Sequence, residues 1–194
     1  MTIACSKLAF AVLLSAMACS AHADTVWNES VNGDLSSDGL SPTAVNFHLG
    51  DNLVTGITGN AGQGVDRDYF TFTVPEGSVL SSLLITNETS VSGSASFIAI
   101  QAGSQVTVTP TGGGVENLLG FTHYGNDLVG TNILPALTTA NVLQSGTYSV
   151  WIQETGGQVS YGLDFTLTPV PLPGAALLLG SGLLGMGALR RRAR

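Results

Sequence analysis

Short runs of alternating apolar and polar residues dominate the chain between residues 24 and 169. In the run 69–74, Phe70, Phe72 and Val74 fall on one side and the intervening threonines on the other. This is the period-2 pattern of a strand with one buried face. The turn sequence Pro-Glu-Gly at 75–77 ends the predicted strand. Residues 79–86 and 96–100 predict two more fully buried strands, and residues 105–109 alternate again.

The last two alternating runs predict a hairpin. They cover residues 148–152 and 161–167, and the glycines at 156–157 supply the positive φ that a tight connection needs. Pro169 ends the second strand because proline has no N–H to donate to a ladder. Residues 110–143 are less regular, and we expect long loops there between two or three strands. Outside the two chain ends, no stretch has the period of a helix.

These strands predict an all-β fold, an antiparallel β-sandwich of the jelly-roll type that occupies residues 24–169 as one domain. Two flanking segments have a different character. Residues 1–23 are predicted to be a signal peptide, and residues 170–194 a C-terminal segment with a transmembrane helix at 174–189.

The N-terminal segment has the parts of a secretory signal. Lys7 precedes an apolar run at 8–18, and Ala21 and Ala23 form an A-x-A cleavage site, so that Asp24 becomes the first residue of the mature protein. We therefore expect the Sec machinery and signal peptidase as partners.

A lipoprotein signal centred on Cys19 is the alternative interpretation, but the preceding Ala-Met-Ala lacks the usual leucine. Cys5 and Cys19 are the two cysteines of the chain. Cleavage removes both, which excludes a disulfide, a thiol nucleophile and a thiolate metal ligand from the mature domain.

The C-terminal segment combines a proline signature, an apolar run and a basic end. Residues 170–173 are Val-Pro-Leu-Pro, and four arginines lie within 190–194. At 1.5 Å per residue the run 174–189 makes about 24 Å of helix, and inclusion of 170–173 brings it to about 30 Å, the thickness of a hydrocarbon core. The arginines are expected to remain on the cytoplasmic side.

This segment resembles the PEP-CTERM class of bacterial sorting signals, most closely the VPLPA-CTERM variant. The matching residues are Val170, Pro171, Leu172, Pro173 and Gly174, where Gly174 replaces the alanine of the signature. The resemblance implies an exosortase-like membrane protease as a partner, cleavage near these residues, and delivery to the cell surface or the extracellular space. An ordinary membrane anchor that is never cleaved is the alternative.

A second resemblance lies in the predicted β-domain. Residues 64–77 (GVDRDYFTFTVPEG), and residues 144–152 together with 161–165, are similar to the first core strand and the closing hairpin of the bacterial pre-peptidase C-terminal domain. The resemblance implies a jelly-roll accessory module without catalytic activity, of a kind that in some members binds calcium.

The mature domain is strongly acidic. Of the six Lys and Arg residues only Arg67 lies within 24–169, against all 13 acidic residues, which gives the domain a formal net charge of −12. Such a field repels nucleic acid and favours cations, so we expect no nucleic-acid partner. Solubility of an exported domain explains the same excess without any ligand.

The acidic residues include one candidate metal site. Asp66 and Asp68 flank Arg67 ahead of a predicted strand, and carboxylates one residue apart can converge on a calcium ion. Loop residues Asp34, Asp38 and Asp51 can supply further oxygens. In the alternative interpretation, Asp68 bonds to its own backbone and Asp66 pairs with Arg67. Calcium is the one cofactor that the sequence suggests.

Catalytic motifs are missing from the sequence of the mature domain. His48 and His123 are far apart in sequence and lack the spacing of a zinc motif, and no G-x-S-x-G motif occurs in 24–169. We therefore predict no catalytic residues and no enzyme. A cryptic hydrolase remains as the alternative, and it requires one of these histidines to meet a serine and an acid.

Aromatic residues suggest a second kind of site. Trp151 alternates with Val150 and Ile152, so it is predicted to project from the outer face of its strand, where a sugar ring can stack on it. Packing of Trp151 beneath a loop is the alternative. Other aromatic candidates for such a platform are Trp27, Tyr124, Tyr148 and Tyr161.

Together these features predict an exported protein of the cell surface or extracellular matrix, with a structural or adhesive role and with exopolysaccharide as a candidate partner. The alternative function is a calcium- or carbohydrate-binding accessory module.

Overall fold

The computed structural model describes residues 23–62 and 64–170. The signal peptide, the transmembrane helix at 174–189 and most of the sorting signature lie outside the described residues. The described part is mostly antiparallel β-sheet that forms a nearly closed, barrel-like arrangement, which confirms the all-β prediction at that level. Four short helical segments lie in its loops.

The strands follow one another along the chain with few intervening helices. They are β1 (Asp24–Asn28), β2 (Thr43–Ala44), β3 (Gly50–Asn60), β4 (Val65–Val74), β5 (Ser78–Ile85), β6 (Ser96–Ala102), β7 (Leu118–Tyr124), β8 (Gly146–Gln153) and β9 (Val159–Pro169). The helical segments are α1 (Glu29–Asn32), η1 (Val115–Asn117), η2 (Asn126–Leu128) and α2 (Leu134–Leu137).

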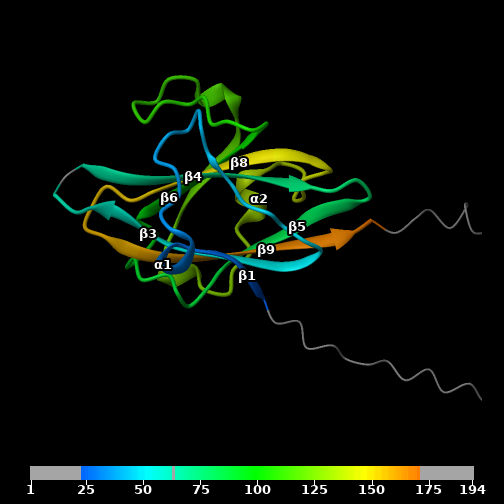
Figure 1. Ribbon diagram of the computed structural model, residues 1–194, viewed down its shortest axis with the longest axis horizontal. Coiled ribbons are helices and arrows are strands. Elements are labelled where there is room, and N and C mark those ends of the chain that lie inside the picture. The colour runs from blue at the N-terminus through cyan, green and yellow to red at the C-terminus, as the bar shows by residue number, and fades with distance from the viewer. Residues whose placement is uncertain (1–22, 63, 171–194) are drawn as a thin grey trace, which may run out of the picture.

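The strands pair in the order β5-β9-β3-β4-β8-β6-β7, and β1 and β2 add to β3 and β4 in parallel. β3 and β4 pair only next to their connection, at Gly59↔Asp66 and Asn60↔Val65. Beyond that point they diverge, so that β4 and β8 run along one side of the molecule and β3 and β9 along the other (Figure 1).

Apolar side chains from both sides fill the space between them. Phe70 and Phe72 from β4 and Phe165 from β9 are at most 2 % exposed. Phe47, ahead of β3, stacks on Phe72 with ring centroids 4.4 Å apart and contacts Phe165 at 5.1 Å. The alternation that predicted a strand over 69–74 therefore identified the buried face correctly.

The predicted hairpin of 148–152 and 161–167 is wrong as a pairing, although both strands exist. β8 pairs with β4 and β6, whereas β9 pairs with β3 and β5. The glycines at 156–157 therefore connect the two sides of the molecule instead of turning one strand onto its neighbour. The alternation of each run identifies the face that is buried, but it does not specify which strand lies beside it.

Further differences from prediction concern residues 105–143 and the strand β3. Residues 105–109 form no strand, and Val106 and Val108 instead pack over the outer face of β4 and β8. The region 110–143 contains one strand, β7, where two or three were expected. β3 was missed, because its Gly-, Thr- and Asn-rich sequence hides the alternation of its buried positions.

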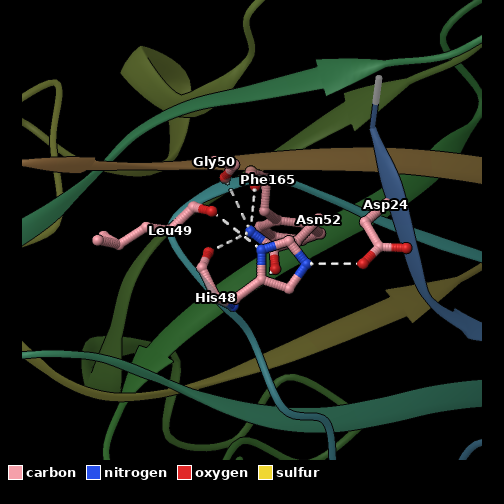
Figure 2. Close-up of polar contacts among 6 residues, drawn as sticks. All are labelled: Asp24, His48, Leu49, Gly50, Asn52 and Phe165. Carbon is pink, nitrogen blue, oxygen red and sulfur yellow. Dashed lines mark hydrogen bonds and ion pairs between the residues drawn. The ribbon is translucent and has the colours of Figure 1, made fainter. Parts of the chain in front are cut away.

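Asn52 organises the start of β3 and the attachment of β1 (Figure 2). It is fully buried, and its Nδ2 donates to the carbonyl oxygens of His48, Gly50 and Phe165 while its Oδ1 accepts from the His48 N–H at 2.8 Å. The His48 ring, held over this turn, lies 3.2 Å from Asp24 Oδ2. Asp24 also pairs with Asn52 in the ladder between β1 and β3, and β1 leads directly into α1.

Candidate metal centre

Glu29 is the first residue of α1. The helix starts there because Asn28 adopts an extended backbone and its side chain accepts from the Ser30 N–H. The Glu29 carboxylate turns toward β3, where its Oε2 accepts from the Ile57 N–H at 2.7 Å. Its Oε1 accepts from the Tyr161 hydroxyl at 3.4 Å. Backbone and side-chain donors therefore hold this carboxylate in one place.

Glu29, Asp34 and Asp68 form a carboxylate cluster. One oxygen from each lies within 4.8 Å of the corresponding oxygen of the other two. Asp34 is exposed in the loop after α1, Glu29 is half-buried, and Asp68 is buried in β4, two residues beyond the point where β4 pairs with β3. The cluster therefore joins the N-terminal segment to the core of the sheet.

Asp68 is the buried member of this cluster. Its side chain is 0 % exposed, and neither carboxylate oxygen has a hydrogen-bond partner among the described residues. Burial and the nearby Glu29 carboxylate raise the pKa of Asp68 from 3.8 to about 9. The Tyr161 hydroxyl opposes this shift from nearby, but its geometry falls short of a hydrogen bond to Asp68. Without a cation, Asp68 is therefore protonated at neutral pH.

The same surroundings also raise the pKa values of the neighbouring acidic residues. Burial raises the pKa of Glu29, with the charge of Asp34 adding to the effect and the Ile57 N–H opposing it. Burial also raises the pKa of Asp66, and the Asp34 charge contributes. The nearby carboxylates repel one another, so this part of the molecule has a local excess of negative charge that a divalent cation would relieve.

Gly56 on β3 makes room for the cluster. A Cβ at this position would lie 2.4 Å from the Tyr161 hydroxyl oxygen and 2.6 Å from the Glu29 carboxyl carbon. Only a residue without a side chain allows Glu29 and Tyr161 to approach β3 this closely.

A surface cavity of about 670 Å³ opens above the cluster. Glu29 and Asp34 line it, whereas Asp68 lies beneath. Asp66 and Glu88 add two further carboxylates to its wall. The cluster is thus open to solvent on one side and closed by the core on the other.

The structure separates the two aspartates of the sequence-based calcium hypothesis. Asp68 is in the cluster, while Asp66 lies on the cavity wall. Asp34, one of the three loop candidates, joins the cluster; Asp38 and Asp51 are outside it.

The alternative interpretations were a bond from Asp68 to its own backbone and an ion pair between Asp66 and Arg67. Neither occurs among the contacts of the described residues. Asp68 accepts no hydrogen bond from its own backbone. Arg67 donates to Gln153 Oε1 at 2.6 Å and to the Val65 carbonyl oxygen, and it forms no ion pair with Asp66 within the described ranges.

Sequence analysis missed Glu29 and Gly56, and it named Tyr161 only as an aromatic candidate for sugar stacking. Glu29 is distant from Asp68 in the sequence, and no local motif links the two. The one available signal was the acidic, turn-rich sequence Asn-Glu-Ser-Val-Asn-Gly-Asp at 28–34, which resembles the oxygen-rich loops that bind calcium.

The histidines do not join a catalytic arrangement with the cluster. His48 contacts Asp24 at the start of β1, and His123 lies on the exposed face of β7 with its ring edge-on to Phe97. Neither belongs to the carboxylate group that the described residues contain.

Trp151 is not an exposed platform. Its side chain is 5 % exposed and stacks on Tyr69 with ring centroids 5.7 Å apart, beneath Val106 and Val108. The expected outward direction is correct, but the loop 105–109 covers the ring, as the alternative interpretation proposed. The other aromatic candidates do not replace it, because Trp27 is partly buried and Tyr124, Tyr148 and Tyr161 belong to the core.

Comparison with models of known protein families finds no match, and comparison with curated proteins finds no significant similarity. Within residues 23–62 and 64–170, no helix is long and apolar enough to span a membrane. The arrangement therefore has to be interpreted from its chemistry. It offers carboxylate oxygens and no nitrogen or sulfur ligand, a donor set that suits a hard cation such as calcium.

Proposed function

We propose that this chain is an exported, non-catalytic protein of the cell surface or extracellular matrix whose β-domain binds a calcium ion through Glu29, Asp34 and Asp68. The observation that supports the calcium site is Asp68, a fully buried carboxylate without a hydrogen-bond partner within residues 23–62 and 64–170, which has one oxygen within 4.8 Å of an oxygen of each of the other two carboxylates. A buried charge without a partner is costly, and a bound cation removes that cost.

The donor set favours calcium over other metals. Zinc normally takes histidine or cysteine ligands, and magnesium keeps most of its water in a small octahedral site. Three carboxylates, one buried, one half-buried and one exposed, suit the larger and less regular coordination of calcium. Export to a calcium-rich exterior agrees with this choice of ion.

The finer fold and the route of export belong to the same proposal. The two sets of strands on either side of the core support a jelly-roll-like β-sandwich, and the calcium site agrees with the resemblance to the pre-peptidase C-terminal domain. The signal peptide at 1–23 and the sorting signature at 170–174 support export by the Sec machinery and processing by an exosortase-like protease. A structural or adhesive role in the matrix follows from the sorting class.

The test is thermal unfolding of the purified protein with calcium or with a chelator. Calcium at about a hundred times its Kd is expected to stabilise the domain by about 2.7 kcal/mol, which raises Tm by roughly 5–10 °C. Asp68→Asn removes a ligand charge and should abolish this rise. Because it also removes the cost of keeping a buried carboxyl group protonated at neutral pH, this variant should unfold at a higher temperature than the unaltered protein in chelator.

Asp38→Asn is the matched control, since Asp38 is an exposed aspartate of the same N-terminal segment that lies outside the cluster. It should keep the full calcium response. An equal rise of Tm in the Asp68→Asn variant and the unaltered protein would contradict the proposed site.

A further inference from the structure

Three carboxylates leave part of the coordination of a calcium ion to other ligands. Calcium takes six to eight oxygens, and each carboxylate supplies one or two. Both oxygens of Glu29 already accept hydrogen bonds, from Ile57, Tyr161 and the Leu35 N–H. Asp34 and Glu29 line the cavity and Asp68 lies below it, so the remaining ligands approach from the cavity.

The cavity has the size and lining of a small-molecule site. Its volume of about 670 Å³ lies within the usual range for ligand pockets. Asn28, Ser30, Gln158 and Ser160 supply amide and hydroxyl groups around it. Ile57, which is 49 % exposed, adds an apolar wall. Polar groups next to a small apolar surface suit a sugar, whose ring has hydroxyl edges and apolar C–H faces.

The charge of the site selects among sugars. The carboxylates in and around the cavity carry more negative charge than one divalent cation neutralises. They are Glu29, Asp34, Asp66, Asp68 and Glu88. An anionic sugar such as a uronate would therefore meet net repulsion. A pair of neighbouring hydroxyl groups brings two neutral oxygens to the cation and adds no further negative charge.

We propose that the cavity binds a neutral sugar unit of a polysaccharide, with two adjacent hydroxyl groups of the sugar completing the coordination of the cation. This inference rests on the proposed calcium site. The groups around the cavity position the sugar ring: the Gln158 amide is exposed on the connection between β8 and β9, and Ile57 packs against the ring face. The site would thus retain a neutral matrix polysaccharide at the cell surface.

The experiment measures retention of the purified protein on immobilised neutral polysaccharides (dextran, mannan and galactan), in millimolar calcium and in chelator. Each resin is also prepared after periodate oxidation and borohydride reduction, which cleaves adjacent diols. Retention on at least one untreated resin is expected in calcium. It should fall about tenfold or more in chelator and on the matching oxidised resin.

A cavity variant separates the sugar from the cation. Gln158→Ala should weaken retention about fivefold, the effect of one lost hydrogen bond, and should leave the calcium affinity measured without sugar unchanged. Asp34→Asn should weaken both calcium binding and retention, whereas Asp38→Asn should change neither.

Several results would overturn the inference. Calcium binding without retention on any of the three resins would exclude the sugar and leave the calcium site intact. Retention that persists in chelator or on oxidised resin would exclude coordination of a diol. If oligolysine binds in chelator and Asp34→Asn weakens that binding, the cavity is an acidic groove for a basic partner. Absence of calcium binding in the protein alone would remove the proposed function as well.

Discussion

Asp68 is a fully buried carboxyl group whose oxygens accept no hydrogen bond from the part of the chain that the structure describes, although the Tyr161 hydroxyl lies nearby. A group of this kind has two ways to avoid the cost of an isolated buried charge: it takes up a proton, or it binds a cation. Its pKa of about 9 shows that the proton prevails when no cation is bound. Binding of calcium therefore competes with this proton.

The raised pKa of Asp68 predicts how stability changes with pH in chelator. From about pH 4, near the unfolded pKa, to about pH 9, the folded protein holds a proton that the unfolded chain has lost, so the free energy of unfolding falls as pH rises, by up to about 1.4 kcal/mol per pH unit. Glu29, Asp66 and Asp164, whose pKa values are also raised, act in the same direction.

Urea unfolding at about pH 5 and about pH 8 measures this effect. The unaltered protein in chelator should be more stable at the lower pH. Asp68→Asn should reduce the difference, because the substituted residue does not titrate, and Asp38→Asn should not. A pH dependence that is the same in Asp68→Asn and the unaltered protein would show that Asp68 does not hold the proton.

The site could be predicted only in part from its residues. Asp68 was identified by its spacing from Asp66 at the start of a strand. Which of the two enters the cluster depended on their positions along β4. Both share a face of the strand with Phe70, but Asp66 pairs with Gly59 next to the connection to β3 and lines the cavity, whereas Asp68 lies two residues further along and is fully buried. No local pattern could identify Glu29, because it approaches Asp68 only once β1 has paired with β3.

At the scale of elements, β3 positions the segments that carry the residues of the site. It pairs with β1, which delivers α1 and Glu29, and with β9, which delivers Tyr161. Gly56 and Tyr161 are directly opposed in the β3–β9 ladder, so the missing side chain at Gly56 is what lets the tyrosine hydroxyl reach Glu29. Glycines in β3 made the strand hard to predict from the sequence, and one of them, Gly56, is needed for the geometry of the site.

This arrangement predicts that Gly56→Ala disrupts the cluster. The added methyl group would overlap the Tyr161 hydroxyl and the Glu29 carboxyl group, and these side chains must then move. Calcium affinity, measured by calorimetry, should fall about tenfold or more, and the domain should lose about 1–3 kcal/mol of stability through overpacking.

Gly157→Ala is the matched control on the connection between β8 and β9, since a Cβ there meets no atom within 4 Å. It should retain the calcium affinity of the unaltered protein. Full calcium binding in the Gly56→Ala variant would show that the close approach of β3 to Glu29 does not matter for the site.

For the whole molecule, the distribution of charge predicts its processing. The arginines of the C-terminal segment and the 13 acidic residues of the domain belong on opposite sides of a membrane if the proposed orientation holds. Intact-mass spectrometry of the secreted protein should then show Asp24 as the first residue and loss of the residues after about Val170. A full-length C-terminal segment in the membrane fraction would show that the segment is a membrane anchor and is not cleaved as a sorting signal. The intact chain in the cytosol would contradict export.

The sequence by itself determined the class of fold, the buried face of β4 and the acidic character of the domain, and it named two of the three carboxylates of the candidate site. These properties depend on the period of apolar residues, on composition and on spacing within a few residues, all of which are local. Tertiary structure alone decided that β8 and β9 lie on different sides of the core, that the 105–109 loop covers Trp151, and that Glu29 meets Asp68. Such contacts join distant parts of the chain, and they form because burial of apolar surface selects one arrangement of strands among the several that the same local pattern allows.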